Sequence, residues 1–171
     1  MISVEYARTM SAYNRWMNER LYETCGDLSD EERKADRGAF FRSIHGTLNH
    51  ILLADRVWLG RFTGEPFAFN SLDQELYSDF AQLLEERRTT DNAIASWAGN
   101  LTEDALATPL IYTRAGATTS TTYPLWVVVA HLFNHQTHHR GQITTLLNQA
   151  GHDMGVTDLI RLPEVASGEL A

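Results

Sequence analysis

Hydrophobic residues recur along this chain at steps of three and four positions, the period of an amphipathic helix. The pattern predicts four long helices, over residues 4–25, 41–63, 71–101 and 125–149. Each helix would bury its apolar stripe against the others, since an isolated stripe of this width would remain exposed to water. The sequence therefore predicts an all-α protein, a four-helix bundle formed by a single domain over residues 1–171.

Local signals mark the expected ends of these helices. Residues 29–32 and 71–74 each fit a capping box, and the second of these would open the third helix. Pro66 cannot continue a helix, so the second helix ends near Gly64 and a long crossover leads to the third. Gly151 is the expected C-cap of the fourth helix.

The segment over residues 109–123 breaks the helical pattern. It is rich in threonine and aromatic residues and carries Gly116 near its middle. Such a composition favours a small β-hairpin or another extended excursion. We expect this excursion to precede the fourth helix and to cover one end of the bundle.

Composition and charge limit the partners that the chain is expected to have. Fourteen Lys and Arg residues stand against 22 Asp and Glu, for a formal net charge of -8, so nucleic-acid binding is not expected. No apolar run is long enough to span a membrane. The one cysteine, Cys25, can form neither an internal disulfide nor a cysteine-based zinc site, which fits a cytoplasmic protein.

Histidines carry the clearest chemical signal in the sequence. Five of the seven lie in two short stretches: His50, His131, His135, His138 and His139. His135 and His139 are four residues apart, so they share one helix face, and they fill a gap in the apolar stripe of the fourth helix. A buried imidazole without a partner costs about 1–3 kcal/mol, and a divalent metal ion would provide that partner.

His50 is the natural third ligand of such a metal. The triplet Leu48-Asn49-His50 is echoed by Phe133-Asn134-His135, which places the two histidines at matching points of two similar helical hairpins. Three histidines without a fourth protein ligand would leave room for water or substrate, as in catalytic sites. Zinc or nickel suits imidazole best. The competing interpretation is a histidine pair that is merely solvated or hydrogen-bonded.

Three more residues are candidates for a supporting role at this site. His131 could orient a ligand or replace one. Asp55 interrupts the apolar stripe of the second helix, where an ion pair with Arg56 or Arg140 is its more ordinary role and orientation of a histidine the alternative. Arg140 follows His139 directly and could hold an anionic group of a substrate.

The stretch HLFNHQTHHRGQ at residues 131–142 resembles the signature of the DinB/YfiT-like superfamily. NRWMN at residues 14–18, LNHILLADRVW at residues 48–58 and GVTDL at residues 155–159 add to the resemblance, which covers nearly the whole chain. It implies a four-helix bundle with a long crossover between helices two and three, and usually a homodimer. Aromatic and apolar residues beyond the needs of one thin bundle fit a dimer, among them Trp58, Phe67, Phe69 and Trp126.

The resemblance also implies a divalent metal held by three histidines, which correspond to His50, His135 and His139. Superfamily members include S-transferases and isomerases that use low-molecular-weight thiols. The favoured hypothesis is therefore a metalloenzyme that transfers a small thiol cosubstrate to an electrophilic small molecule. The alternatives are a metal-dependent hydrolase, for which no general base stands out, a non-catalytic stress-related metal-binding dimer, and a structural metal closed by His131 or Asp55.

Overall fold

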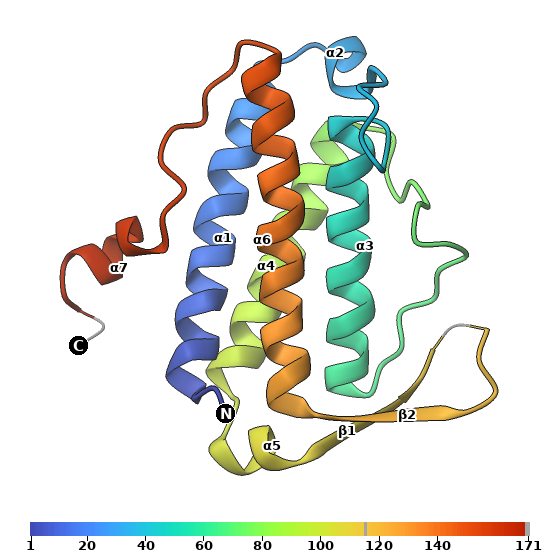
Figure 1. The fold of residues 1–171 in the computed structure, drawn as a ribbon, viewed down its shortest axis with the longest axis vertical. Coiled ribbons are helices and arrows are strands. Elements are labelled where there is room, and N and C mark those ends of the chain that lie inside the picture. Colours follow the sequence, from blue (N-terminus) through green and yellow to red (C-terminus); the bar gives the residue numbers. More distant parts are fainter. Residues whose placement is uncertain (115, 170–171) are drawn as a thin grey trace.

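The computed structural model describes residues 1–114 and 116–169. Four long helices lie side by side in it (Figure 1), namely α1 (Val4–Gly26), α3 (Ile44–Thr63), α4 (Phe80–Gly99) and α6 (Leu125–Gln149). Shorter elements complete the order: α2 (Asp30–Lys34), α5 (Glu103–Ala107), β1 (Pro109–Thr113), β2 (Ser120–Pro124), η1 (Leu159–Arg161) and α7 (Pro163–Ala166). The prediction of a mainly helical protein is confirmed.

The long helices enclose one hydrophobic core. α1 and α3 each pack against both α4 and α6, so every long helix contacts two of the others. Fully buried side chains from all four meet between them, among them Leu21, Leu52, Ile94 and Phe133. Burying one such side chain contributes about 1.5–3 kcal/mol, so the core supplies most of what holds the helices together.

Helix ends follow the local signals in most places. Ser3 and Ser43 accept hydrogen bonds from the backbone N–H groups of Tyr6 and Gly46 at the starts of α1 and α3. The expected capping box at residues 29–32 is present and opens α2. Gly64 closes α3 in the left-handed conformation, with φ 77°, which only glycine adopts without strain.

The expected helix start at residue 71 is wrong. Residues 71–79 form no helix, and α4 begins at Phe80, with Asp79 as its N-cap. Polar side chains of α3 explain the difference, because they bind the backbone of this segment. Asn49 Oδ1 accepts from the N–H groups of Leu76 at 2.8 Å and Tyr77 at 2.9 Å, so these groups are not available to a helix.

The crossover from α3 to α4 folds back along α3. A Cβ added to Gly60 would lie 2.5 Å from the carbonyl oxygen of Glu65, so the close return of the chain requires glycine there. The carbonyl of Tyr77 accepts from Asn49 Nδ2 at 3.1 Å and from His45 Nε2 at 2.9 Å. The crossover is thereby fixed against the face of α3 that also carries His50.

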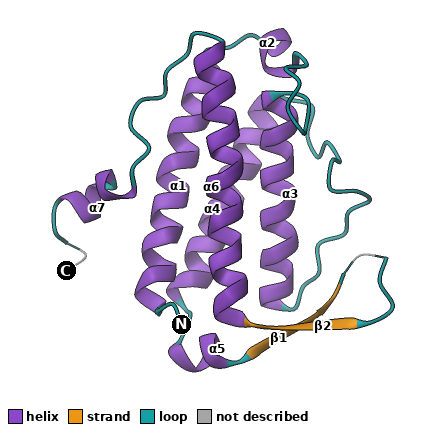
Figure 2. Ribbon diagram, viewed as in Figure 1, coloured by secondary structure: helices purple, strands orange, loops and turns teal. Residues whose placement is uncertain are grey.

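The hairpin expected near residues 109–123 is present. β1 and β2 pair antiparallel, with Pro109 opposite Pro124 and Tyr112 opposite Thr121. Figure 2 shows the hairpin crossing one end of the helices, below α3 and α6. The C-terminal segment lies instead beside α1, where Tyr13 donates a hydrogen bond to the carbonyl of Thr157 at 2.5 Å. Within the described residues, every helix is too short or too polar to cross a lipid bilayer.

Candidate metal centre

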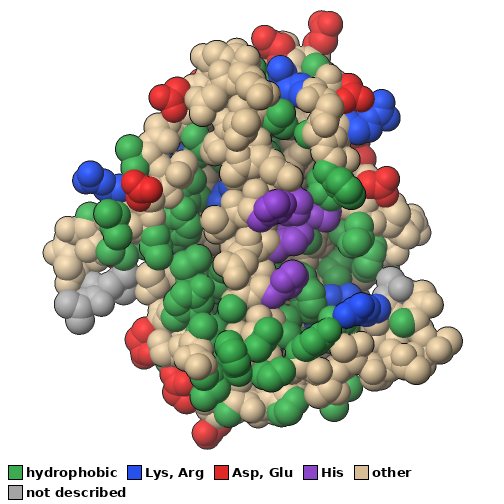
Figure 3. Space-filling view, viewed as in Figure 1, with side chains coloured by type: hydrophobic (Ala, Val, Ile, Leu, Met, Phe, Trp, Pro, Cys, Tyr) green, Lys and Arg blue, Asp and Glu red, His purple; other side chains and the backbone are tan. Residues whose placement is uncertain are grey.

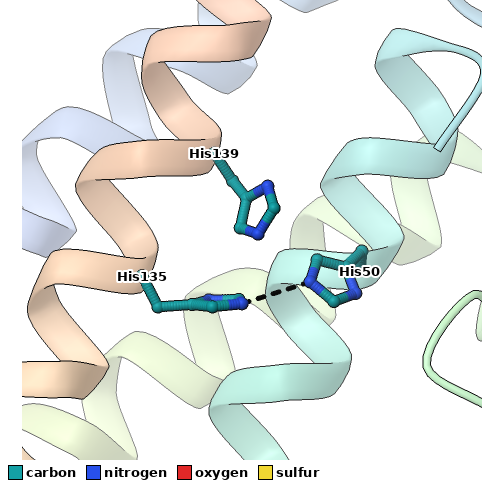
Figure 4. Close-up of side chains that lie close together, drawn as sticks. All are labelled: His50, His135 and His139. Atoms are coloured by element: carbon teal, nitrogen blue, oxygen red, sulfur yellow. Dashed lines mark hydrogen bonds between the residues drawn. The ribbon is translucent and has the colours of Figure 1, made fainter. Parts of the chain in front are cut away.

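Three of the predicted histidines meet between α3 and α6. α3 supplies His50 and α6 supplies His135 and His139, one turn apart (Figure 4). Each offers a ring nitrogen, and these three atoms lie within 4.8 Å of one another. The ε nitrogens of His50 and His135 are 3.2 Å apart. We call these residues the histidine triad.

Hydrogen bonds at the δ nitrogens aim two of the rings. His50 Nδ1 lies 2.8 Å from the carbonyl oxygen of Leu72, which can only accept, so Nδ1 carries the proton. His139 Nδ1 faces Gln142 Oε1 at 2.7 Å in the same way. Both ε nitrogens are therefore left with a lone pair that points into the triad, the form in which imidazole binds a metal.

His135 is the least satisfied member of the triad. Its Nδ1 is buried and has no hydrogen-bond partner among the described residues. Its Nε2 faces the ε nitrogen of His50, which already presents a lone pair. A proton placed between the ε nitrogens of His50 and His135 would satisfy only that pair. A cation would accept lone pairs from all three rings. The donor set thus fits a divalent metal ion.

Burial keeps these imidazoles neutral at physiological pH. Desolvation lowers the pKa of His50 to about 4 and that of His135 to about 3, with His139 adding to both effects. Desolvation also lowers the pKa of His139. A metal ion therefore does not have to displace protons from the ring nitrogens at neutral pH.

Two cavities open at the triad. The larger has a volume of about 680 Å³ and runs between α3 and α6 from His50 and His135 to the hairpin. The second, of about 640 Å³, reaches His50 and His139 beside Phe40 and Phe41. Phe41 stacks on His50 with ring centroids 3.8 Å apart. Figure 3 shows histidine side chains at the surface of this face. The two cavities make the triad accessible to small molecules.

His131 and His138 lie near the triad but outside it. The ring of His131 lines the larger cavity, with its centroid 5.3 Å from Trp58 and 5.9 Å from His135. It is not part of the group whose nitrogens converge on one point. His138 is exposed and lines the second cavity.

Arg140 does not face the cavities, contrary to its expected role in holding an anion. It is only 3% exposed and lines neither cavity. Its Nη1 donates to Gln136 Oε1 at 3.1 Å and to Asn14 Oδ1 of α1. Consecutive side chains on a helix point about 100° apart, so Arg140 faces α1 although its neighbour His139 faces α3.

Asp55 forms a buried ion pair, but with an arginine that the sequence analysis did not consider. Arg87 of α4 donates to Asp55 Oδ2 at 2.6 Å and contacts Asp91 Oδ1 at 2.8 Å. Gln136 also donates to Asp55, while Arg56 pairs with Glu86 instead. The buried residues of this network are named the buried charge cluster. Its members are Asn14, Asn18, Asp55, Arg87, Asp91, Gln136 and Arg140.

A signal for the missed members existed in the sequence. Leu83, Arg87, Asp91 and Ile94 follow each other at helical steps of four, four and three, so an arginine and an aspartate occupy the apolar stripe of α4. Opposite charges at such positions indicate a buried pair. Asp55 contacts no histidine in the described structure, so its expected alternative role in orienting a metal ligand has no geometric support.

Comparisons with known proteins agree with this fold. The protein DinB of Bacillus subtilis (strain 168) is 28% identical over 162 residues, which cover 90% of this chain and 91% of that protein. A crystal structure of a DinB-like protein from Bacillus cereus ATCC 10987 is similar in fold, with a TM-score of 0.60 and 24% identity over 82% of this chain and 89% of that one. The model of the DinB family matches residues 1–170, and the chain therefore belongs to the DinB family.

Proposed function

We propose that this protein is a metalloenzyme whose divalent cation is held by His50, His135 and His139. The observation that carries the proposal is the convergence of three neutral ring nitrogens. No cysteine, aspartate, glutamate or further histidine of the described residues joins this group. A three-ligand site leaves coordination positions for water or substrate, which is typical of catalytic rather than structural metals. Zinc and nickel fit the all-imidazole donor set best.

The favoured reaction is transfer of a low-molecular-weight thiol to an electrophilic small molecule in the larger cavity. A divalent cation at the triad would supply acidity, because coordination deprotonates a thiol and lowers the pKa of water. The cavity walls are mainly apolar, which suits an apolar electrophile. Among the described residues of the larger cavity no carboxylate is present that could activate water, and Asp73 lines only the second cavity, so hydrolysis is the second choice.

The test of this function begins with elemental analysis of the protein as purified. We expect about one zinc or nickel ion per chain. The loaded protein is then assayed with chlorodinitrobenzene as electrophile and glutathione, cysteine or coenzyme A as thiol, with the variant His135→Ala as the metal-free control. Faster transfer by the loaded protein supports the transferase. Full metal loading without transfer or ester hydrolysis favours a non-catalytic metal-binding module.

We also propose that the protein forms a homodimer. Besides the resemblance to its family, support comes from apolar side chains left at the surface of the C-terminal segment, where Val156 is 52% and Ile160 is 68% exposed. Exposed apolar side chains that lie close together in this way are typical of surfaces that bind another protein. Light scattering at micromolar concentration should give twice the monomer mass of 19.3 kDa. A monomer over a wide dilution range would contradict the dimer.

A further inference from the structure

The larger cavity carries unbalanced positive charge at the end that lies away from the triad. Arg61 and Arg114 line this end, and the described residues that line the cavity include no aspartate or glutamate. Neither arginine is in a salt bridge with a described residue. Arg61 is half-buried among apolar and aromatic side chains, whereas Arg114 beside it is exposed. Their two positive charges, with no carboxylate in the described lining, favour binding of an anion at this end.

Aromatic packing holds Arg61 in place. Its guanidinium carbon lies 4.3 Å from the ring centroid of Trp58 and 4.3 Å from that of Tyr112. The two rings meet at 78° with centroids 5.4 Å apart, so the guanidinium sits in an aromatic corner. Cation–π packing fixes the ion without using its N–H donors. Arg114 donates to the hydroxyl of Tyr123 at 3.1 Å, whereas Arg61 donates to no described residue.

The distance between the two ends defines the shape of the ligand. Arg61 follows His50 by eleven residues on α3, so their Cα positions are about 16 Å apart along the helix axis. The wall between them is apolar and is formed mainly by Ala54, Val57, Val127 and Val128. A molecule that reaches both ends must therefore be extended, with an apolar middle.

We infer that Arg61, with Arg114 beside it, binds the anionic group of an extended substrate whose other end reacts at the triad. The recognised chemistry is a carboxylate or phosphate on an apolar body, since the planar fork of arginine donates two parallel hydrogen bonds to either group. The placement of the reacting end at the triad rests on the proposed function. Recognition of the anion is independent of that function, because Arg61 acts without the metal.

Calorimetric titration with three matched probes tests this assignment. Octanoate and octyl phosphate carry the anion on an apolar chain, and octanamide is the neutral control. We expect the protein as purified to bind at least one anion roughly 10-fold or more tightly than octanamide. The anion that binds more tightly identifies the chemistry as carboxylate or phosphate. Equal affinity for all three probes would overturn the inference.

Variants locate the binding group. Arg61→Gln should weaken the preferred anion about 10-fold and leave octanamide unchanged, while Arg61→Lys should retain part of the preference. Arg15→Gln removes the same charge from an exposed position of α1 and should change neither affinity. An unchanged anion preference in Arg61→Gln, with the fold intact by circular dichroism, would refute the role of Arg61.

The same titration in His135→Ala separates this inference from the metal site. A preference that survives in this variant, and is lost on adding Arg61→Gln, supports the arginine site even if the protein binds no metal. A preference that disappears in His135→Ala and is insensitive to Arg61→Gln would mean that the anion binds the metal. That result would refute the arginine site and leave the proposed metal function standing.

Discussion

Two groups of polar side chains lie between the same helices, and they differ in charge balance and in access from outside the protein. They are neighbours along the chain, since His135 of the triad is followed by Gln136 of the buried charge cluster. The cluster contains two aspartates and two arginines, whose formal charges cancel. The triad contains three imidazoles and no counter-group among the described residues.

The charge cluster balances its own charges, although Asp55 Oδ1 and Arg87 Nε have no hydrogen-bond partner among the described residues. Arg87 joins Asp55 and Asp91 directly. The side-chain amide of Asn14 connects Arg140 to this group. Arg140 donates to Asn14, and Asn14 donates in turn to Asp91 at 3.3 Å. Side chains from all four long helices take part, so the cluster fixes how the helices are arranged around it. Its charges are balanced and its residues line neither cavity, so its role is structural.

The triad is open by comparison. Its rings are aimed by Leu72 and Gln142, yet their ε nitrogens converge on one another, and His135 Nδ1 has no described partner. Both cavities reach it, whereas the charged members of the cluster line neither. The difference teaches that burial of polar residues alone does not mark a site. The candidate site is marked instead by ring nitrogens that converge without a counter-group and by cavities that give access from outside.

The largest expected effect concerns metal content. His135→Ala removes one of three ligands and should lower metal affinity by more than the roughly 10–100-fold that loss of an outer partner costs. Elemental analysis after dialysis measures this directly. His152→Ala, which alters a histidine outside the triad, should retain the wild-type metal content. Equal metal content in the two variants would refute the metal assignment.

The next effect concerns stability and the charge cluster. Asp55→Ala leaves Arg87 buried with half of its counter-charge, and it should lower the free energy of unfolding by about 3–5 kcal/mol. Urea denaturation measures the loss. Lys34→Ala removes a solvent-exposed partner of Asp30 and should leave the free energy of unfolding almost unchanged. A comparable small loss in Asp55→Ala would show that the cluster is not the structural centre described above.

These two regions were not equally predictable from the sequence. The triad could be found because His135 and His139 share a helix face and the Asn-His echo pointed to His50. Helical periodicity identifies which positions face inward but not which helix lies opposite. For that reason Asp55 was matched with Arg56 or Arg140, while Arg87 of α4 is its partner.

The prediction of a helix start at residue 71, in the crossover, failed for a related reason. Residues 71–74 carry a local capping signal, but Asn49, twenty-seven residues before Leu76, captures the backbone N–H groups that a helix would need. Such long-range hydrogen bonds are not visible in local sequence and override helix propensity. The helical limits of α6, in contrast, agree with prediction at both ends because no such competitor intervenes.

A smaller effect should separate ligands from the groups that aim them. Gln142→Leu removes the acceptor of the His139 Nδ1 proton without removing a ligand, and it should weaken metal affinity about 10–100-fold. Competition with a chelator of known affinity measures the change. Thr145→Val alters an exposed residue of the same helix and should have no effect. Unchanged affinity in Gln142→Leu would show that this hydrogen bond does not orient His139.

The smallest effect tests the contrast between the accessible triad and the charge-balanced cluster in the metal-free protein. His135→Leu replaces a ring whose Nδ1 lacks a described partner by an apolar side chain of similar size. Because an unpaired buried polar atom costs about 1–3 kcal/mol, the replacement should raise the free energy of unfolding by about 1 kcal/mol in the presence of a chelator. Asp55→Leu, the matched change in the charge cluster, should lower it, because Arg87 then loses a buried counter-charge. Adding metal should reverse the order for the triad, since only the wild-type protein is then stabilised by binding. A loss of stability in metal-free His135→Leu would mean that the protein itself satisfies the triad.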